Sequence, residues 1–255
     1  MADYRPRKTL FNPELRRRGI YILPNLFTTA ALFSGFYAIV QAMNGKFEVA
    51  AVAIFIAMVF DGLDGRVARL THTQSAFGAE YDSLSDMVSF GAAPALVVYE
   101  WALKDLGKLG WIAAFIYCVG AALRLARFNT NIEVVDKRWF QGLPSPAAAA
   151  LVSGLVWVLI DNEWSGQEAR WYACSLTIFA GVTMVTNLRY YSGKNINLRK
   201  SVPFIIVVAV ALGFALVSSY PPGVLFALFL VYALSGYLLA ALDWLSKRKK
   251  LAPGE

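Results

Sequence analysis

Eight apolar stretches run through this chain of 255 residues, and each has about the length that a helix needs to cross a bilayer. A transmembrane helix takes about 20 predominantly apolar residues. Hydrophobic residues make up 58% of the chain, against about 45–50% in ordinary soluble domains. The sequence therefore predicts an all-α fold, a polytopic integral membrane helix bundle of about eight transmembrane helices. The stretches lie near residues 22–43, 48–66, 83–103, 108–126, 146–162, 171–187, 203–219 and 223–245.

Basic segments flank the predicted bundle at both ends. Residues 1–21 mix Lys and Arg with apolar residues, as do segments that lie along an anionic membrane surface. We expect a short interfacial segment over 1–21, one membrane domain over 22–246 and a basic tail over 247–255. The net charge of +7 suits that surface, and the sequence shows no module for recognising nucleic acid.

The Lys and Arg residues also predict an orientation. With eight spans both termini share a side, and twenty of the 24 basic residues fall on that side. Only Lys46, Lys104, Lys108 and Arg170 fall on the other. Because basic residues accumulate in cytoplasmic loops, we expect both termini, and any site near residue 70, on the cytoplasmic side of the cell (inner) membrane.

Four aspartates interrupt the apolar sequence where the second stretch ends and the third begins. Asp61 and Asp64 are three residues apart, and Asp82 and Asp86 are four apart. Each spacing puts a pair on one helix face. If the two helices pack antiparallel through a loop near residues 71–80, the pairs face each other. A charged side chain at membrane depth costs about 3 kcal/mol and usually marks a functional site.

Facing carboxylate pairs repel each other unless a cation lies between them. The chain has one histidine, and neither of its two cysteines is near the aspartates, so the ligands on offer are oxygens. Oxygen ligands favour a hard ion, Mg²⁺ or Mn²⁺, over zinc. Two such ions form a common clamp for phosphoryl displacement. The spacing therefore predicts two divalent ions held by Asp61, Asp64, Asp82 and Asp86.

The aspartates belong to a longer pattern, Asp61-x2-Asp64-Gly65-x2-Ala68-Arg69-x8-Gly78-x3-Asp82-x3-Asp86. It resembles, without a gap, the signature of the CDP-alcohol phosphotransferases, membrane enzymes that move a phosphatidyl group from a CDP-linked lipid to an alcohol and release CMP. The segments FGAEYDSLSD, VSFGAAPAL, RLARFN and QGLPSPAAAA are most similar to the branch in which the alcohol is serine. The resemblance implies CDP-diacylglycerol and L-serine as substrates, in the lipid bilayer, and a homodimer.

The resemblance also implies roles for individual residues. It assigns one ion to Asp61, Asp64 and Asp82, and the second to Asp61, Asp82 and Asp86. Asp86 is also the expected base that accepts the proton of the serine hydroxyl. The CDP-lipid is expected against Pro24, Asn25, Thr28, Gly65, Ala68, Arg69, Ser75 and Gly78.

Each of these lipid contacts has a plainer alternative. Gly65 and Gly78 could be close-packing glycines of membrane helices. Arg69 could be an interfacial cation and Ser75 an ordinary polar loop residue. The segment that begins with Pro24 could be no more than a helix start.

Serine carries a carboxylate beside its hydroxyl, so its site needs a cation. Arg124 and Arg127, three residues apart at the end of the fourth stretch, could supply it, with Asn129 and Ser145 as neutral partners. The alternative is that both arginines anchor the helix at the membrane interface.

Two other functions remain open from the sequence. A relative that uses glycerol 3-phosphate or inositol phosphate would need a strongly basic acceptor pocket, which the two arginines do not exclude. A divalent-cation transporter would also hold aspartates in the membrane. It predicts polar residues spread along a path, whereas the last four stretches carry almost no acidic residue before Asp243.

Overall fold

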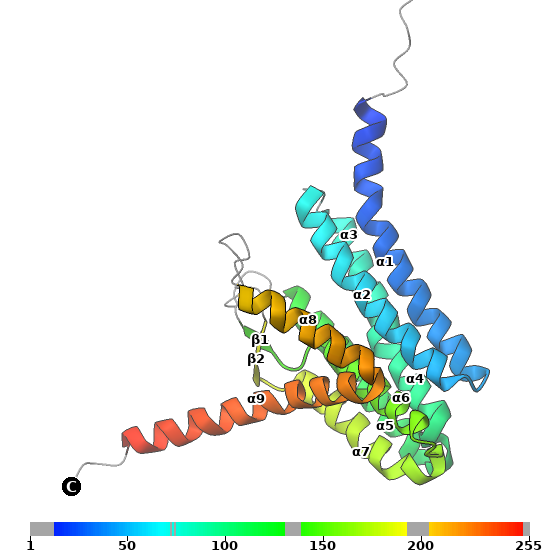
Figure 1. Ribbon diagram of the computed structural model, residues 1–255, viewed down its shortest axis with the longest axis vertical. Coiled ribbons are helices and arrows are strands. Elements are labelled where there is room, and N and C mark those ends of the chain that lie inside the picture. The colour runs from blue at the N-terminus through cyan, green and yellow to red at the C-terminus, as the bar shows by residue number, and fades with distance from the viewer. Residues whose placement is uncertain (1–12, 72, 74, 131–138, 193–203, 252–255) are drawn as a thin grey trace, which may run out of the picture.

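The computed structural model describes residues 13–71, 73, 75–130, 139–192 and 204–251, and within these ranges the chain is almost entirely helical (Figure 1). Two π-helical segments, η1 (Met87–Ala92) and η2 (Tyr99–Leu103), and one 3₁₀ turn, η3 (Lys104–Leu106), interrupt the α-helices. The α-helices are α1 (Pro13–Met43), α2 (Phe47–Thr71), α3 (Ala76–Asp86), α4 (Ala93–Val98), α5 (Lys108–Thr130), α6 (Ser145–Asp161), α7 (Gly166–Val185), α8 (Phe204–Ser219) and α9 (Pro221–Leu251).

The elements from α3 to η2 follow one another without a break over residues 76–103. Counted as one rod, they bring the described part of the chain to eight helical rods, one for each apolar stretch. Three segments are long and apolar enough to cross a membrane by length and composition, Leu23–Met43, Lys108–Thr130 and Pro221–Ser246. Ser145–Asp161 and Val210–Ser219 are shorter apolar helices. The predicted all-α membrane helix bundle is confirmed.

The structure differs from the sequence prediction between α2 and α3. The expected loop near 71–80 is shorter, because α3 already begins at Ala76. Ser75 has an extended backbone and its Oγ accepts a hydrogen bond from the Gly78 amide at 3.0 Å. A serine N-cap of this kind starts a helix, and the third rod therefore begins about seven residues before the apolar stretch does.

A second difference is a small ribbon that the sequence did not predict. Strand β1 (Trp139–Gln141) pairs antiparallel with β2 (Arg189–Tyr191), with Phe140 opposite Tyr190. Gly142 follows β1 with φ +76°, and a Cβ there would lie 2.2 Å from the Met184 carbonyl oxygen. Only glycine allows both the backbone angle and this close approach. The ribbon therefore holds the segment before α6 against the end of α7.

Small residues make up much of the core between the rods. Ala147, Ala148, Ala149 and Ala150 of α6 are all buried. Where α5 crosses α7, a Cβ on Gly120 would lie 2.4 Å from the carbonyl oxygen of Gly181. Between membrane helices the lipid competes for apolar side chains, so close backbone packing of small residues holds the helices together.

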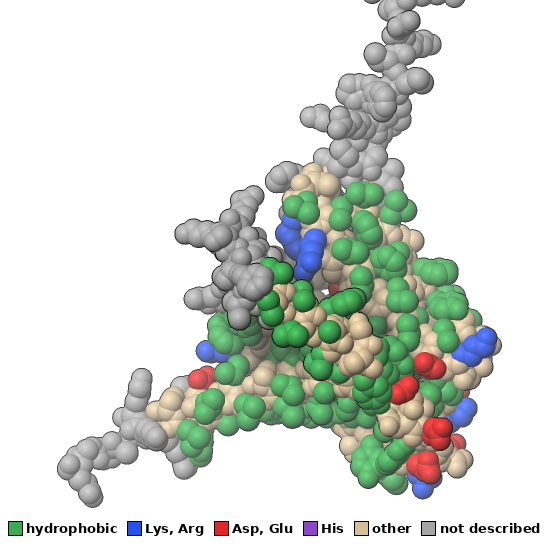
Figure 2. Space-filling model, in the orientation of Figure 1, with side chains coloured by type: hydrophobic (Ala, Val, Ile, Leu, Met, Phe, Trp, Pro, Cys, Tyr) green, Lys and Arg blue, Asp and Glu red, His purple; other side chains and the backbone are tan. Residues whose placement is uncertain are grey.

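Large hydrophobic side chains point outward instead. Phe33 is 67% exposed and Phe214 is 74% exposed. Figure 2 shows such side chains over much of the visible surface, whereas charged side chains gather near the end where α1 turns into α2 and α6 into α7. An apolar exterior with charge at its ends is the surface of a multi-pass membrane protein.

The few basic residues predicted for the far side lie at one end of the rods. Lys46 is in the α1–α2 turn, Lys104 and Lys108 flank Gly107, and Arg170 is in α7 near its start. A hydrogen bond from Asn162 Nδ2 to the Tyr220 hydroxyl joins the α6–α7 and α8–α9 turns at that end. The basic residues within 1–12, 131–138 and 193–203, on which the orientation also depends, lie outside the described residues.

The two predicted flanking segments are partly helical. Helix α1 starts at Pro13, inside the segment 1–21, and runs through Pro24 without a break. Helix α9 continues to Leu251, inside the tail 247–255. Pro24 therefore does not start a helix, which removes the plainer alternative for that residue. The division of the chain at residues 21 and 246 stays a prediction.

Candidate active site

An acidic cluster forms where the ends of α2 and α3 face each other. Asp61 and Asp64 come from α2, and Asp82 comes from α3. One carboxylate oxygen from each lies within 4.8 Å of those of the other two. The i, i+3 spacing on α2 and the packing of both α2 and α3 against α1 produce this geometry, in which Asp82 faces the α2 pair as predicted.

Asp86 lies one helical turn beyond Asp82, at the end of α3, and is not one of these three. Its electrostatic neighbours are Asp61, Asp82 and Arg124. Asp61 is near enough for the two carboxylates to repel each other. Asp86 therefore connects the acidic triad to the guanidinium group on α5.

Helix α1 holds the buried member of the triad. Asp64 is 5% exposed, and its Oδ2 lies 2.8 Å from the Thr28 hydroxyl, which is itself buried. The same hydroxyl lies 3.2 Å from the Pro24 carbonyl oxygen. Further along α1, the Thr28 carbonyl oxygen accepts a hydrogen bond from Ser85 of α3 at 3.1 Å. One turn of α1 thus fixes both α2 and α3.

The cluster has the features of a site for a hard divalent ion. Within the described ranges no Lys or Arg forms a salt bridge with any of the four aspartates. Asp82 Oδ1 is buried without a hydrogen-bond partner there. A buried carboxylate oxygen without a donor is costly, and oxygen ligands alone suit Mg²⁺ or Mn²⁺. The residues present therefore fit the predicted ions.

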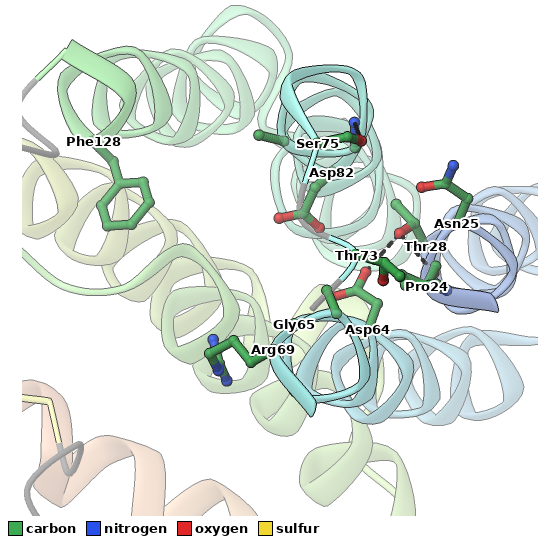
Figure 3. A pocket seen from close by; sticks show the side chains of 13 residues that line it. Pro24, Asn25, Thr28, Asp64, Gly65, Arg69, Thr73, Ser75, Asp82 and Phe128 are labelled. Atoms are coloured by element: carbon green, nitrogen blue, oxygen red, sulfur yellow. Dashed lines mark hydrogen bonds between the residues drawn. The ribbon is translucent and has the colours of Figure 1, made fainter. Parts of the chain in front are cut away.

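A cavity of about 470 Å³ opens beside the cluster, between α1, α2 and α3 (Figure 3). Asp64 and Asp82 face each other across it, with Asn25 and Thr28 on the α1 side. All eight residues predicted to contact the CDP-lipid line this cavity. They are Pro24, Asn25, Thr28, Gly65, Ala68, Arg69, Ser75 and Gly78.

The two glycines keep the cavity open in different ways. A Cβ on Gly78 would lie 3.1 Å from Ser75 Oγ and 3.6 Å from Asn25 Oδ1, so it would crowd the cap of α3. A Cβ on Gly65 would meet only the end of the Arg69 side chain, at 3.6 Å. Gly65 is therefore not required for close backbone packing, and its missing side chain leaves room in the cavity.

Three further lining residues were not singled out from the sequence: Thr73, Ala79 and Phe128. Thr73 lies in the turn before Ser75, and its hydroxyl is 2.7 Å from that of Thr71. Phe128 belongs to the segment RLARFN, from which only the polar residues had been selected. The sequence signal that could have identified it is an aromatic residue among polar ones, because a nucleotide base can stack against an aromatic ring.

The predicted serine-binding residues separate into different environments. Arg124 is 8% exposed, donates from Nη1 to Ser145 Oγ at 2.7 Å, and has a buried Nε without a partner in the described part of the chain. Arg127 instead donates to the carbonyl oxygens of Val185 and Thr186, at the end of α7. The structure therefore brings Arg124 and Ser145 together, with Arg124 in electrostatic interaction with Asp86, and directs Arg127 elsewhere.

Asn129 lies apart from both arginines. Its Nδ2 donates to Ser83 Oγ at 2.9 Å, at an exposed position between α5 and α3. This contact joins the end of α5 to the helix that carries Asp82. Asn129 is thus placed to hold the two helices together rather than beside the guanidinium group.

Comparison with known proteins connects this geometry to a family. Residues 21–183 match the family described as CDP-alcohol phosphatidyltransferase. A protein of Helicobacter pylori (strain 26695) named CDP-diacylglycerol–serine O-phosphatidyltransferase is 35% identical over 236 residues, covering 91% of this chain and 98% of that protein. Proteins of the same name from Methanocaldococcus jannaschii and Saccharomyces cerevisiae are 37% identical over 187 residues and 40% identical over 149 residues. These matches cover 72% and 51% of this chain, and 81% and 53% of the two relatives.

Proposed function

The chain belongs to the CDP-alcohol phosphatidyltransferase family, and we propose that it transfers the phosphatidyl group of CDP-diacylglycerol to the hydroxyl group of L-serine. The products are phosphatidylserine and CMP. The observation that carries this proposal is the cavity that all eight expected lipid contacts line, with two of the aspartates in its wall. The relatives named for this reaction support the choice of serine.

We assign one divalent ion to Asp61, Asp64 and Asp82, and a second to Asp61, Asp82 and Asp86. Mg²⁺ or Mn²⁺ bound there would stabilise the negative charge of the diphosphate and of the departing CMP. The buried Asp82 Oδ1 without a hydrogen-bond partner and the clustered oxygens of the triad support this assignment.

On the donor side, the chain's own residues bind and orient the CDP-lipid. Arg69 lies about one helical turn beyond the α2 aspartates and offsets part of the diphosphate charge. Thr28 holds Asp64 through the 2.8 Å hydrogen bond and so fixes which of its oxygens faces the cavity. Ser75 and Gly78 shape the wall at the start of α3, and Phe128 offers an aromatic surface to the base.

On the acceptor side, Asp86 accepts the proton of the serine hydroxyl as that oxygen attacks the phosphorus that carries diacylglycerol. The bond between this phosphorus and the oxygen of CMP breaks in the same in-line displacement. A covalent enzyme intermediate is not required. Cys118 and Cys174 lie within α5 and α7, in the predicted spans, and are assigned to packing.

Arg124 is the cation that we assign to the serine carboxylate. Its guanidinium is buried, has an Nε donor without a partner among the described residues, and interacts electrostatically with Asp86. Of the two predicted cations, Arg127 is already engaged by the end of α7. A single available guanidinium matches a carboxylate better than the doubly charged phosphate of glycerol 3-phosphate or inositol phosphate.

We further propose that the active site and both termini face the cytoplasm, in the cell (inner) membrane, and that the protein is a homodimer. The gathering of Lys46, Lys104 and Lys108 at the end of the rods away from the aspartates supports this orientation. Single cysteines at 104 and 194 test it with a membrane-impermeant reagent. Labelling of both from the same side of intact cells would contradict the eight-span orientation.

An acceptor panel with purified enzyme and CDP-diacylglycerol tests the proposed reaction. Radiolabelled serine, glycerol 3-phosphate and inositol phosphate are supplied one at a time and in competition, and the lipid products are separated. We expect serine to be used best. Preference for a phosphorylated acceptor would refute the choice of serine while leaving the transfer chemistry intact.

A further inference from the structure

The rod that carries Asp82 and Asp86 changes its helical form directly after Asp86. Helix α3 ends at that residue and the π-helical segment η1 begins at the next one, Met87. The Ala93 amide donates to the Val88 carbonyl oxygen, five residues earlier instead of four. A π turn takes up about one residue more than an α turn. It therefore sets how the part of the rod before it is rotated relative to the part after it.

Pro94 gives a reason for the π turn at this place. Proline has no amide hydrogen, and its ring crowds the carbonyl group four residues earlier. For Pro94 that group belongs to Phe90, which lies inside η1 and is 0% exposed. The α-helical donor to the Phe90 carbonyl oxygen is therefore missing in a buried, apolar place, where an unpaired carbonyl group is costly.

Tyr117 of α5 supplies a donor to this carbonyl group. Its hydroxyl donates to the Phe90 carbonyl oxygen at 2.9 Å, and its side chain is 0% exposed. Side chains of neighbouring helices commonly satisfy backbone groups freed by proline within a membrane. On the other side of the rod, Ser85 and Ser89 donate to the carbonyl oxygens of Thr28 and Ala31 in α1, each at 3.1 Å. The π turn is thus fixed between α1 and α5.

We propose that Tyr117 is a positioning residue for the transfer reaction. Its hydroxyl bonds the carbonyl oxygen that Pro94 leaves without its α-helical donor, and so holds η1 in the rotation that directs Asp86 toward Asp61. The inference rests on the proposed role of Asp86 as the base. Tyr117 itself has no contact with the cavity and acts only through η1.

The chain offers a matched control. Tyr190 is also 0% exposed, and its hydroxyl also donates to a backbone carbonyl oxygen of a helix, that of Ala233 in α9, at 2.8 Å. Tyr117→Phe and Tyr190→Phe therefore remove the same group from the same kind of bond. Only the first bonds to η1, the segment that directly follows Asp86.

Steady-state kinetics of the two purified variants separate positioning from general stability. We expect Tyr117→Phe to lower kcat about 10- to 100-fold, since small displacements of a catalytic group have effects of that size. The KM for CDP-diacylglycerol should stay close to wild type, as should the binding of the Mn²⁺ ion assigned to Asp61, Asp64 and Asp82, measured by electron paramagnetic resonance. Equal losses in Tyr117→Phe and Tyr190→Phe, or unchanged kcat in Tyr117→Phe, would overturn the proposal.

Pro94→Ala completes a double-mutant cycle, because it supplies the amide hydrogen that residue 94 lacks. In that background Phe90 no longer depends on Tyr117, so Tyr117→Phe should lower kcat by a much smaller factor than in the wild-type background. The same factor in both backgrounds contradicts the mechanism. If Tyr117→Phe alone does not fold, the double variant is expected to fold, and its failure to do so also contradicts the mechanism.

The cycle is run with whichever acceptor wild-type enzyme uses best. A wrong assignment of serine then shows in the wild-type rates with the acceptor panel. A wrong role for Tyr117 shows only in the ratios between variants. The two failures are therefore distinguishable.

Discussion

The donor half and the acceptor half of the site are built differently. The donor half consists of turns of α1, α2 and α3, and five of its eight predicted lipid contacts come from the 26-residue signature that also holds the aspartates. In the acceptor half, Arg124 of α5 meets Ser145, which is 21 residues away, at the start of α6. Helical spacing places the aspartates of the first half, with α1 holding them through Thr28, whereas the second half is formed only by contacts between separate helices.

This difference determines what a substitution should do. In the donor half, several aspartates share one task, so losing one charge should disable the whole cluster. In the acceptor half, the serine carboxylate is assigned to one buried guanidinium, that of Arg124, and its loss should affect one substrate alone. This division would be wrong if a donor-side substitution selectively changed the use of serine, or if an acceptor-side substitution changed the use of the lipid.

Removal of divalent ions should have the largest effect. EDTA is expected to abolish turnover, because the clustered carboxylates then repel each other and the diphosphate loses its counter-charge. Mg²⁺ or Mn²⁺ should restore activity, whereas Ca²⁺, which prefers a larger and looser shell, should restore it poorly. Turnover is measured after dialysis and addition of each ion. Full activity in EDTA would refute the ion site.

The second largest effect should be that of Asp61→Asn. We expect kcat to fall about a thousandfold or more, with a parallel loss of metal-dependent CDP-diacylglycerol binding. Asp86→Asn should lower kcat by a similar factor but retain lipid binding better, because its assigned proton transfer occurs only in the reaction. Asp105→Asn, at the exposed η3 turn, is the control and should be unaffected. Full activity of Asp61→Asn would contradict its role for both ions.

Substitutions of the two arginines test the acceptor half, and their expected effects on kinetics are smaller than those of the aspartates. Arg124→Gln should raise the KM for serine by about 10- to 100-fold, the value of a charge-assisted hydrogen bond, with little change in the KM for CDP-diacylglycerol. Arg124→Lys should recover only part of this, because lysine cannot form a bidentate pair. Arg127→Gln should instead lower the thermal stability, since it loses its bonds to the end of α7. A selective rise in serine KM in Arg127→Gln would reverse the assignment.

The sequence predicted the donor half in detail because its signal is local. Helical spacing placed Asp61 and Asp64 on one face, and the pattern of the family selected the lining residues from Pro24 to Gly78. Phe128 was missed, because it approaches the cavity from α5 through tertiary packing and not through spacing. Thr73 was missed in a turn whose extent depended on the Ser75 cap.

In the acceptor half the sequence could not choose between two arginines three residues apart. Both lie near the end of α5, and their difference arises from what packs against them. The end of α7 comes close to Arg127, whereas Ser145 and Asp86 come close to Arg124. The same reason explains why the β1–β2 ribbon and the π turn after Asp86 were not predicted. Each depends on residues that are far apart in the sequence or on a donor from another helix.

The smallest effects, and the sharpest comparison of the two halves, should come from two buried hydroxyl groups. Thr28 holds Asp64 at 2.8 Å on the donor side, and Ser145 holds Arg124 at 2.7 Å on the acceptor side. Thr28→Val and Ser145→Ala each remove one hydrogen bond to a charged group, worth about 1.5–3 kcal/mol. Relaxation of the freed side chain should reduce the kinetic effect to about tenfold.

The direction of each effect matters more than its size. Thr28→Val should raise the KM for CDP-diacylglycerol and the Mn²⁺ concentration needed for half-maximal activity, and leave the KM for serine unchanged. Ser145→Ala should raise only the KM for serine, because Arg124 then loses the partner that orients its guanidinium group. Both constants are measured for both variants at saturating levels of the other substrate. Effects on both substrates in either variant would mean that the two halves are coupled through Asp86, which interacts electrostatically with both Asp61 and Arg124.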